Sequence, residues 1–237
     1  MPGPKLGTVK VTDTAARAEH RWPAAIALIV ALTLYATLPS TFFPILRYVV
    51  VGIGLVLLVP LLLVNPVRLQ KELRWTRLLS VGQTLILLIA NQVALVQLVF
   101  ELVNAKNQDG PTLLLAAVQV WVTNVIVYAL LYWEIDRGGP VSRTQTARKD
   151  MPIADFRFPQ DEDHDAIVEV AARSSAKTNW TAGFVDYLYF SASNSMAFSP
   201  TDTMPLAPRA KILMLAESFA GFVILALVIA RAVSLLG

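Results

Sequence analysis

Cysteine is absent from the 237 residues of this sequence, and histidine occurs only at His20 and His164. The absence of cysteine excludes disulfides, thiolate metal sites and a cysteine nucleophile, and two histidines far apart in sequence argue against a metal centre. Phosphate-binding loops, nucleotide fingerprints, nucleophile elbows and paired carboxylates at catalytic spacing are missing as well. The sequence therefore predicts a protein that is not an enzyme and that binds no metal or cofactor.

Charged side chains are also scarce. They make up 16% of the residues, hydrophobic side chains make up 55%, and the mean hydropathy is +0.56. This composition is too apolar for a soluble domain and predicts a polytopic membrane protein embedded in the lipid bilayer. Lysine and arginine (20) exceed aspartate and glutamate (17) by only three, so the charge balance does not indicate a nucleic-acid partner.

Long apolar runs are what the sequence has in abundance. A helix needs about 20 mainly apolar residues to cross a hydrocarbon core of about 30 Å. Five runs are suited to this role, namely Trp22–Phe42, Tyr48–Val64, Val81–Phe100, Leu113–Trp133 and Ile212–Ala230. A sixth segment, Gly183–Ser199, carries many polar side chains and needs protein around it. The predicted fold is an all-α, polytopic membrane protein with five to six membrane elements, and six crossing elements are slightly favoured over a re-entrant sixth helix.

Hydrophilic stretches divide the chain into a tail (1–21), a four-helix region (22–133), a hydrophilic loop (134–182) and a C-terminal helix pair (183–237). Basic side chains gather in the tail and after the second run, at Lys5, Lys10, Arg17, Arg21, Arg68, Lys71, Arg74 and Arg77. The turn between the third and fourth runs holds only Lys106. Because cytoplasmic loops retain lysine and arginine, we expect the N-terminus, the 65–80 turn and the 134–182 loop in the cytoplasm.

From Asp186 onward the order is an aromatic-rich helix, a short polar turn, Pro205 and a long apolar helix. This order resembles the pore-loop region of the potassium-channel superfamily, in which a pore helix with paired aromatics precedes a T-x-G-Y-G-D filter, a proline and an inner helix with a glycine hinge. The pore-helix positions would be Asp186, Tyr189, Phe190 and Asn194. The filter-like strip would be Ala197, Phe198, Ser199, Pro200, Thr201 and Asp202, and the lining helix would carry Glu217 and Gly221.

The resemblance implies a homo-oligomer, a tetramer if channel-like, that interacts with monovalent cations. Both filter glycines are replaced here, by Ser199 and Thr201, and Pro200 stands at the tyrosine position. The carbonyl rings of such a filter need backbone conformations that glycine permits. The resemblance thus implies a divergent cation channel with altered or lost potassium selectivity, in which Asp202 helps to set ion preference and Gly221 permits bending.

The segment Asp186-Tyr187-Leu188-Tyr189-Phe190 is also similar to a D-[FY]-L-Y-F motif of uncharacterised bacterial polytopic membrane proteins. That resemblance implies the bacterial cytoplasmic membrane and brings no activity with it. The alternative function is a non-conducting scaffold or accessory protein that binds a partner through the 134–182 loop.

Polar residues inside the apolar runs leave two interpretations open. Glu217 is the only carboxylate within its run, and pairing with Arg209 or Lys211 is favoured over an ion or proton pathway. Polar side chains recur at helical spacing in the third and fourth runs, at Thr84, Asn91, Asn124, Tyr128 and Tyr132. We expect them to hydrogen-bond between helices, with a substrate path as the alternative.

The acidic cluster at 161–165 favours a solvated surface over a Ca²⁺ or Mg²⁺ site.

Overall fold

The computed structural model describes residues 18–39, 43–70, 73–104, 110–162, 165–197 and 202–236. It confirms the all-α polytopic class, because four of the described helices are long and apolar enough to cross a membrane. They are α3 (Pro44–Val64), α4 (Arg74–Asn104), α5 (Gly110–Ile135) and α10 (Pro208–Leu236). A shorter apolar helix, α2 (Trp22–Ala36), precedes them.

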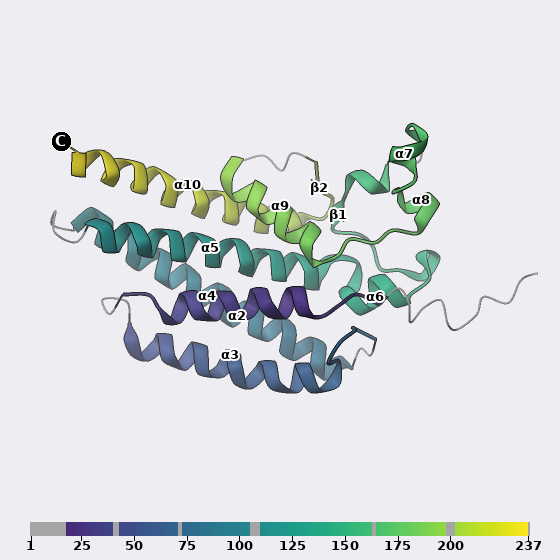
Figure 1. Cartoon of the computed structure of the whole chain (residues 1–237), viewed down its shortest axis with the longest axis horizontal. Helices are drawn as coiled ribbons and strands as arrows, with labels where there is room; N and C mark the ends of the chain where they lie inside the picture. Colours follow the sequence, from purple (N-terminus) through teal and green to yellow (C-terminus); the bar gives the residue numbers. More distant parts are fainter. Residues whose placement is uncertain are drawn as a thin grey trace, which may run out of the picture.

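Helix α5 is the centre of the bundle, and α2, α4 and α10 pack against it (Figure 1). Of its most apolar stretch 72% is buried, against 28% for α3 and for α10. Small side chains at Ala116, Ala117 and Ala129 are fully buried and let neighbouring helices approach closely. Helices α10 and α3 lie on opposite sides of the bundle (Figure 1). Because α10 is at the edge, most of its apolar surface is not covered by other helices.

The bundle has a loop end and a far end (Figure 1). The loop end holds residues 18–21, the turn after α3 and the 136–182 region. The first two are joined by backbone hydrogen bonds, from Arg21 N to Val67 O (3.1 Å) and from Leu69 N to Glu19 O (3.0 Å). The far end holds the end of α2, the start of α5 and the C-terminus. The three segments that we expect in the cytoplasm therefore lie at one end, apart from residues 1–17, which are outside the described part of the chain.

The hydrophilic region is a set of short elements folded over the loop end. Its helices are η2 (Asp136–Gly138), α6 (Pro140–Gln145), η3 (Arg148–Asp150), η4 (Pro159–Asp161), α7 (Val168–Ala171) and α8 (Ser175–Thr178). One small antiparallel sheet pairs β1 (Phe156–Arg157) with β2 (Met204–Pro205). At the turn after α5, Arg137, Gly138 and Gly139 have φ of 49°, 80° and 95°, which glycine tolerates readily at the last two positions. This turn reverses the chain back over the bundle.

Helix α9 (Phe184–Ala197) is re-entrant with respect to the bundle, and its 14 residues are not among the described helices that are long enough to cross a membrane. This path does not favour the six crossing elements that the sequence slightly preferred. It begins at the loop end, where Phe184 N donates to Glu19 Oε1 at 2.5 Å. It ends beside the middle of the bundle, where Ser195 Oγ accepts a hydrogen bond from Trp121 Nε1 at 2.9 Å. By Met204 the chain is back at the loop end, paired with β1 (Figure 1). Five helices therefore run between the two ends, and α9 enters and leaves on the same side.

Candidate functional site: the re-entrant helix and its buried carboxylate

The 14 residues of α9 form a helix with two unlike faces. Side chains at helical spacing, namely Tyr187, Phe190, Ser191, Asn194 and Ser195, are buried against α5 and α10. Val185, Tyr189 and Met196 form the opposite, exposed face. The aromatic pair named by the channel resemblance is thus divided, because Phe190 is in the core and Tyr189 is 63% exposed. Asp186 holds the start of the helix by accepting a hydrogen bond from Gly183 N at 2.8 Å.

Glu217 is the group that fastens α9 to the bundle. Its side chain is fully buried (0% exposed), and it accepts hydrogen bonds from Tyr132 Oη at 2.7 Å and Asn194 Nδ2 at 2.6 Å. The Ser191 hydroxyl lies within hydrogen-bond reach of both Glu217 and the carbonyl of Val125, and its single proton serves one acceptor at a time. Burial of a carboxylate is costly unless such donors offset the lost hydration. One carboxylate therefore ties together α5, α9 and α10.

The expected partners of Glu217 were wrong. Arg209 instead forms a two-pronged pair with Asp155, with Nε to Oδ1 and Nη2 to Oδ2 both at 2.6 Å. Lys211 is exposed, whereas Glu217 is sealed in the core. The sequence missed the true partners because Tyr132 and Ser191 lie far from Glu217 along the chain and meet it only when α9 folds back.

Gly221 has a packing role that the sequence did not indicate. A Cβ at this position would lie 2.4 Å from the Ser195 carbonyl oxygen and 2.7 Å from its Oγ. Only glycine therefore lets α10 approach the C-terminal turn of α9 this closely. The bending role that the channel resemblance implies for Gly221 stays a prediction.

The filter-like strip lies largely outside the described residues. Ala197 is the last residue of α9, and Phe198, Ser199, Pro200 and Thr201 are not among the residues that the structure describes. Asp202 is exposed at the loop end, just before β2. Of the predicted site residues, the structure brings Asn194 and Glu217 into direct contact and places Gly221 against Ser195.

A second anchor, at the loop end, was missed by sequence reasoning. Asp136 is fully buried and accepts hydrogen bonds from Tyr187 Oη at 2.5 Å and from Asp155 N at 2.8 Å. The ring of Phe156 packs against those of Tyr187, Phe190 and Tyr132. These contacts join the hydrophilic region to the start of α9. They could not be predicted from hydrophobic periodicity or from a local sequence motif.

A third anchor comes from the N-terminal segment. The Glu19 carboxylate accepts hydrogen bonds from Trp133 Nε1 at 3.0 Å and Phe184 N at 2.5 Å. Burial raises the pKa of Glu19 above its ordinary value, while the positive charge of Arg143 acts in the opposite direction. The segment before α2 is thereby coupled to the start of the re-entrant helix.

The interhelical hydrogen bonds predicted for α4 and α5 are confirmed at Asn91, Asn124 and Tyr132, whereas Thr84 donates to the Ser80 carbonyl within α4. Asn124 Oδ1 accepts from Asn91 Nδ2 at 3.1 Å and from Gln92 Nε2 at 3.0 Å, and Gln83 Nε2 donates to the Gly54 carbonyl at 2.7 Å. The expectation of a solvated acidic face was wrong at Asp161, which is partly buried and accepts from Arg137 Nη2 at 2.6 Å. No group of metal-binding side chains occurs in the described part of the chain, which omits residues 163 and 164.

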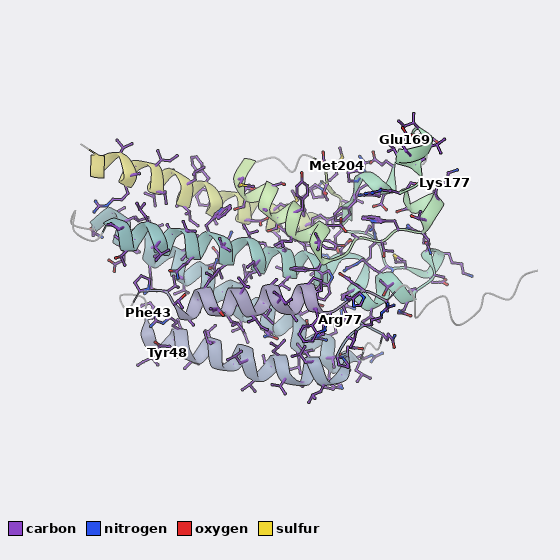
Figure 2. All side chains as sticks on the ribbon, in the orientation of Figure 1. Phe43, Tyr48, Arg77, Glu169, Lys177 and Met204 are labelled. Atoms are coloured by element: carbon purple, nitrogen blue, oxygen red, sulfur yellow. The ribbon has the colours of Figure 1, made fainter. Side chains whose placement is uncertain are left out.

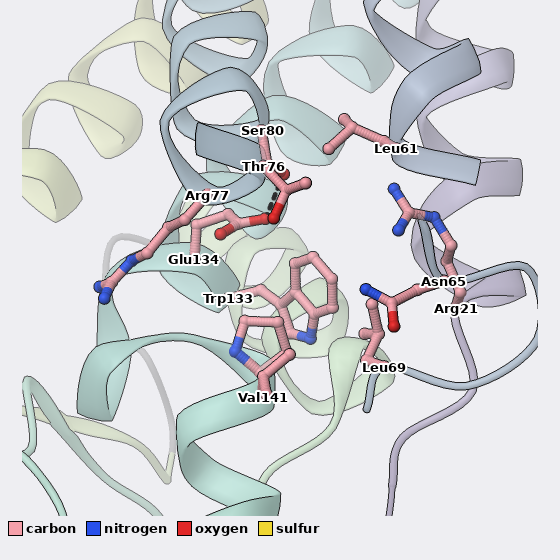
Figure 3. A pocket seen from close by; sticks show the side chains of 11 residues that line it. Arg21, Leu61, Asn65, Leu69, Thr76, Arg77, Ser80, Trp133, Glu134 and Val141 are labelled. Atoms are coloured by element: carbon pink, nitrogen blue, oxygen red, sulfur yellow. Dashed lines mark hydrogen bonds between the residues drawn. The ribbon is translucent and has the colours of Figure 1, made fainter. Parts of the chain in front are cut away.

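Two cavities border this assembly. A cavity of about 50 Å³ lies at the loop end, where Arg21, just before α2, and Glu134 of α5 line it and Ser80 donates a hydrogen bond to Glu134 (Figure 3). A larger, apolar cavity of about 430 Å³ lies beside the tip of α9, between Trp121 and Gly221. Neither cavity extends from the loop end to the far end, because the first is lined by residues at the loop end and the second by residues beside the end of α9.

No family model, curated protein or solved structure matches this chain in the comparisons. The class of protein therefore follows from its own helices, which define an integral membrane protein with transmembrane helices.

Proposed function

We propose that this protein is one subunit of an oligomeric, channel-like protein of the bacterial cytoplasmic membrane, with altered or lost potassium selectivity. The observation that carries the proposal is the re-entrant path of α9, which enters at the loop end, reaches the level of Gly221 and returns to β2. By the resemblance to pore-loop channels, a cation path would run beside the C-terminal end of α9.

The path has to form between copies of the chain. The polar side chains that line the contacts among α4, α5, α9 and α10 bond to one another, which leaves no continuous polar route within the described bundle. The uncovered faces of α9 and α10 are broad and apolar, with Tyr189, Leu215 and Phe219 among the exposed side chains. Such faces suit contact with lipid or with a neighbouring copy. The resemblance to potassium channels makes four copies the natural number.

The orientation follows from the basic residues. Arg68, Arg74 and Arg77 lie in the turn and first helical residues at the loop end, and segments rich in lysine and arginine stay on the cytoplasmic side. The N-terminus is then cytoplasmic, α9 enters from the cytoplasm and the C-terminus lies outside. This is opposite to the arrangement of potassium channels.

Flux through reconstituted protein tests the proposal. The purified chain is placed in liposomes and the uptake of K⁺ and Na⁺ is measured for the unmodified protein, for Asp202→Asn and for the control Glu169→Gln. Glu169 is an exposed carboxylate on α7 (Figure 2). We expect cation flux whose K⁺ to Na⁺ ratio changes in Asp202→Asn and is unchanged in the control. Absence of flux through protein shown to be folded and oriented would refute the channel proposal.

The alternative, a non-conducting scaffold, is favoured by one feature of the hydrophilic region. Ile153 is 91% exposed and Val168 is 84% exposed, and Ile167 beside it is exposed as well. Exposed aliphatic side chains on a small folded surface are typical of contact sites. If the chain is a scaffold, Val168→Ser together with Ile167→Ser should abolish capture of a cytoplasmic partner while leaving the thermal stability of the bundle unchanged.

A further inference from the structure

A ligand-sized cleft lies in the hydrophilic region, away from α9. It has a volume of about 580 Å³, and its walls come from α6 and the residues that lead into η3 on one side, and from residues 178–181 after α8 on the other. Clefts of roughly 300–1,000 Å³ are the size that small ligands occupy in proteins. Figure 1 shows both walls beyond the ends of the long helices, where soluble molecules and lipid headgroups have access.

The walls of the cleft are rich in side chains that can donate hydrogen bonds. Arg143 and Arg148 line the cleft together with the hydroxyl groups of Thr146 and Thr181, and no carboxylate is among the lining residues. Arg148 bridges the two walls, since its Nε donates to Asn179 Oδ1 at 2.8 Å and its Nη2 donates to the Trp180 carbonyl. Asn179 is itself held in a left-handed conformation (φ 54°). The two walls and their polar groups are therefore fixed relative to each other.

Arg143 supplies the second observation. Its side chain is 1% exposed, and its Nη1 donates to the carbonyls of Trp133 at 2.6 Å and Asp136 at 2.8 Å. Its Nε and Nη2 are buried without a hydrogen-bond partner, and its guanidinium lies over the ring of Tyr187, with Cζ 4.9 Å from the ring centroid. Glu19, Glu134 and Asp186 interact with its charge at longer range, yet none of them forms an ion pair with it. A buried guanidinium with unused donors is costly unless an anion or water completes it.

We propose that this cleft binds a phosphate group, carried either by a soluble small molecule or by the headgroup of an anionic lipid. Guanidinium groups bind phosphate through charge-assisted hydrogen bonds, and threonine side chains on both walls bring further hydroxyl donors to the cleft. The volume exceeds that of phosphate alone, so the rest of the ligand lies against Trp180 and Met151. This site does not depend on the channel proposal, because none of its residues belongs to α9 or α10.

Binding to full-length protein in maltoside micelles, which contain no phosphate, tests the site. One arm titrates inorganic phosphate by calorimetry in a phosphate-free buffer. The other arm adds phosphatidic acid, with diacylglycerol as the matched phosphate-free lipid, and counts bound lipid by native mass spectrometry. Binding of inorganic phosphate assigns a soluble ligand, and binding of phosphatidic acid alone assigns a lipid headgroup. Binding of neither overturns the proposal.

Variants decide whether the observed binding is at this cleft. Arg148→Gln removes an exposed charge and should weaken binding by about tenfold, the value of one charge-assisted contact. Arg143→Lys keeps the charge but loses the fork and should weaken binding as well. Arg173→Gln, an exposed arginine of the same region that does not line the cleft, is the control. Equal affinities of Arg148→Gln and the control would overturn the assignment, even if Arg143→Lys fails to fold.

Discussion

Replacing Gly221 by alanine tests the packing of the re-entrant helix directly. The added Cβ would meet the Ser195 carbonyl oxygen at 2.4 Å and Ser195 Oγ at 2.7 Å. The hydroxyl can rotate away, but the carbonyl belongs to the backbone of α9 and can move only with the helix. Overpacking of this kind typically costs about 1–3 kcal/mol. The intrinsic gain from glycine to alanine in a helix, about 0.5–1 kcal/mol, offsets only part of this.

Gly82→Ala is the matched control, because Gly82 lies inside α4 and a Cβ there would meet nothing within 4 Å. We expect Gly221→Ala to unfold in detergent at a free energy about 1–3 kcal/mol below that of Gly82→Ala, in a denaturant titration followed by tryptophan fluorescence. Equal stabilities of the two variants would refute the close approach of α9 and α10.

Three further predictions concern the carboxylates and the topology. Glu217→Gln should lower the free energy of unfolding by about 1–3 kcal/mol, because the amide has one acceptor oxygen for the donors Tyr132, Ser191 and Asn194. A loss below about 0.5 kcal/mol in the denaturant titration would contradict these hydrogen bonds to Glu217. The raised pKa of Glu19 means that the folded state holds its proton more tightly than the unfolded state. Stability should therefore fall as the pH rises from the ordinary carboxyl range through the raised pKa. Glu19→Gln should reduce this slope in unfolding curves recorded at several pH values, and part of it should remain because burial raises the pKa of Asp186 as well. In the cysteine-free chain, Leu206→Cys should be labelled from the same side of the membrane as Val67→Cys in the turn after α3, and labelling of the two from opposite sides would contradict the re-entrant path.

The fold class could be read from the sequence because transmembrane helices are long and nearly free of charge. The predicted runs Leu113–Trp133 and Val81–Phe100 lie within α5 (Gly110–Ile135) and α4 (Arg74–Asn104), and α4 is longer because it extends past its apolar stretch. Hydropathy reports the lipid-facing length of a helix and not its ends. This is why the spans were predicted better than their boundaries.

The arrangement of α9 could not be predicted in the same way. Its polar residues Ser191 and Asn194 are compatible with a crossing helix or a re-entrant one, and the choice depends on contacts with Glu217, more than 20 residues away. The anchor around Asp136 is equally non-local, since its partners Asp155 and Tyr187 come from separate segments. Sequence periodicity carries no information on such pairings, which arise only from the folded chain.

The position of Glu217 in the last helix has a consequence for biosynthesis. While the ribosome is still making α10, the amide of Asn194 lacks both the Glu217 carboxylate and the Met214 carbonyl to which it donates, and polar groups without partners are poorly tolerated in hydrocarbon. Helix α9 therefore has to wait outside the bilayer, or at its surface, until α10 has been inserted. The earlier helices can assemble as they emerge, whereas this part of the protein is completed only after α10 has been made. A chain that stops short of α10 is therefore expected to retain an unplaced helix that quality-control proteases can recognise.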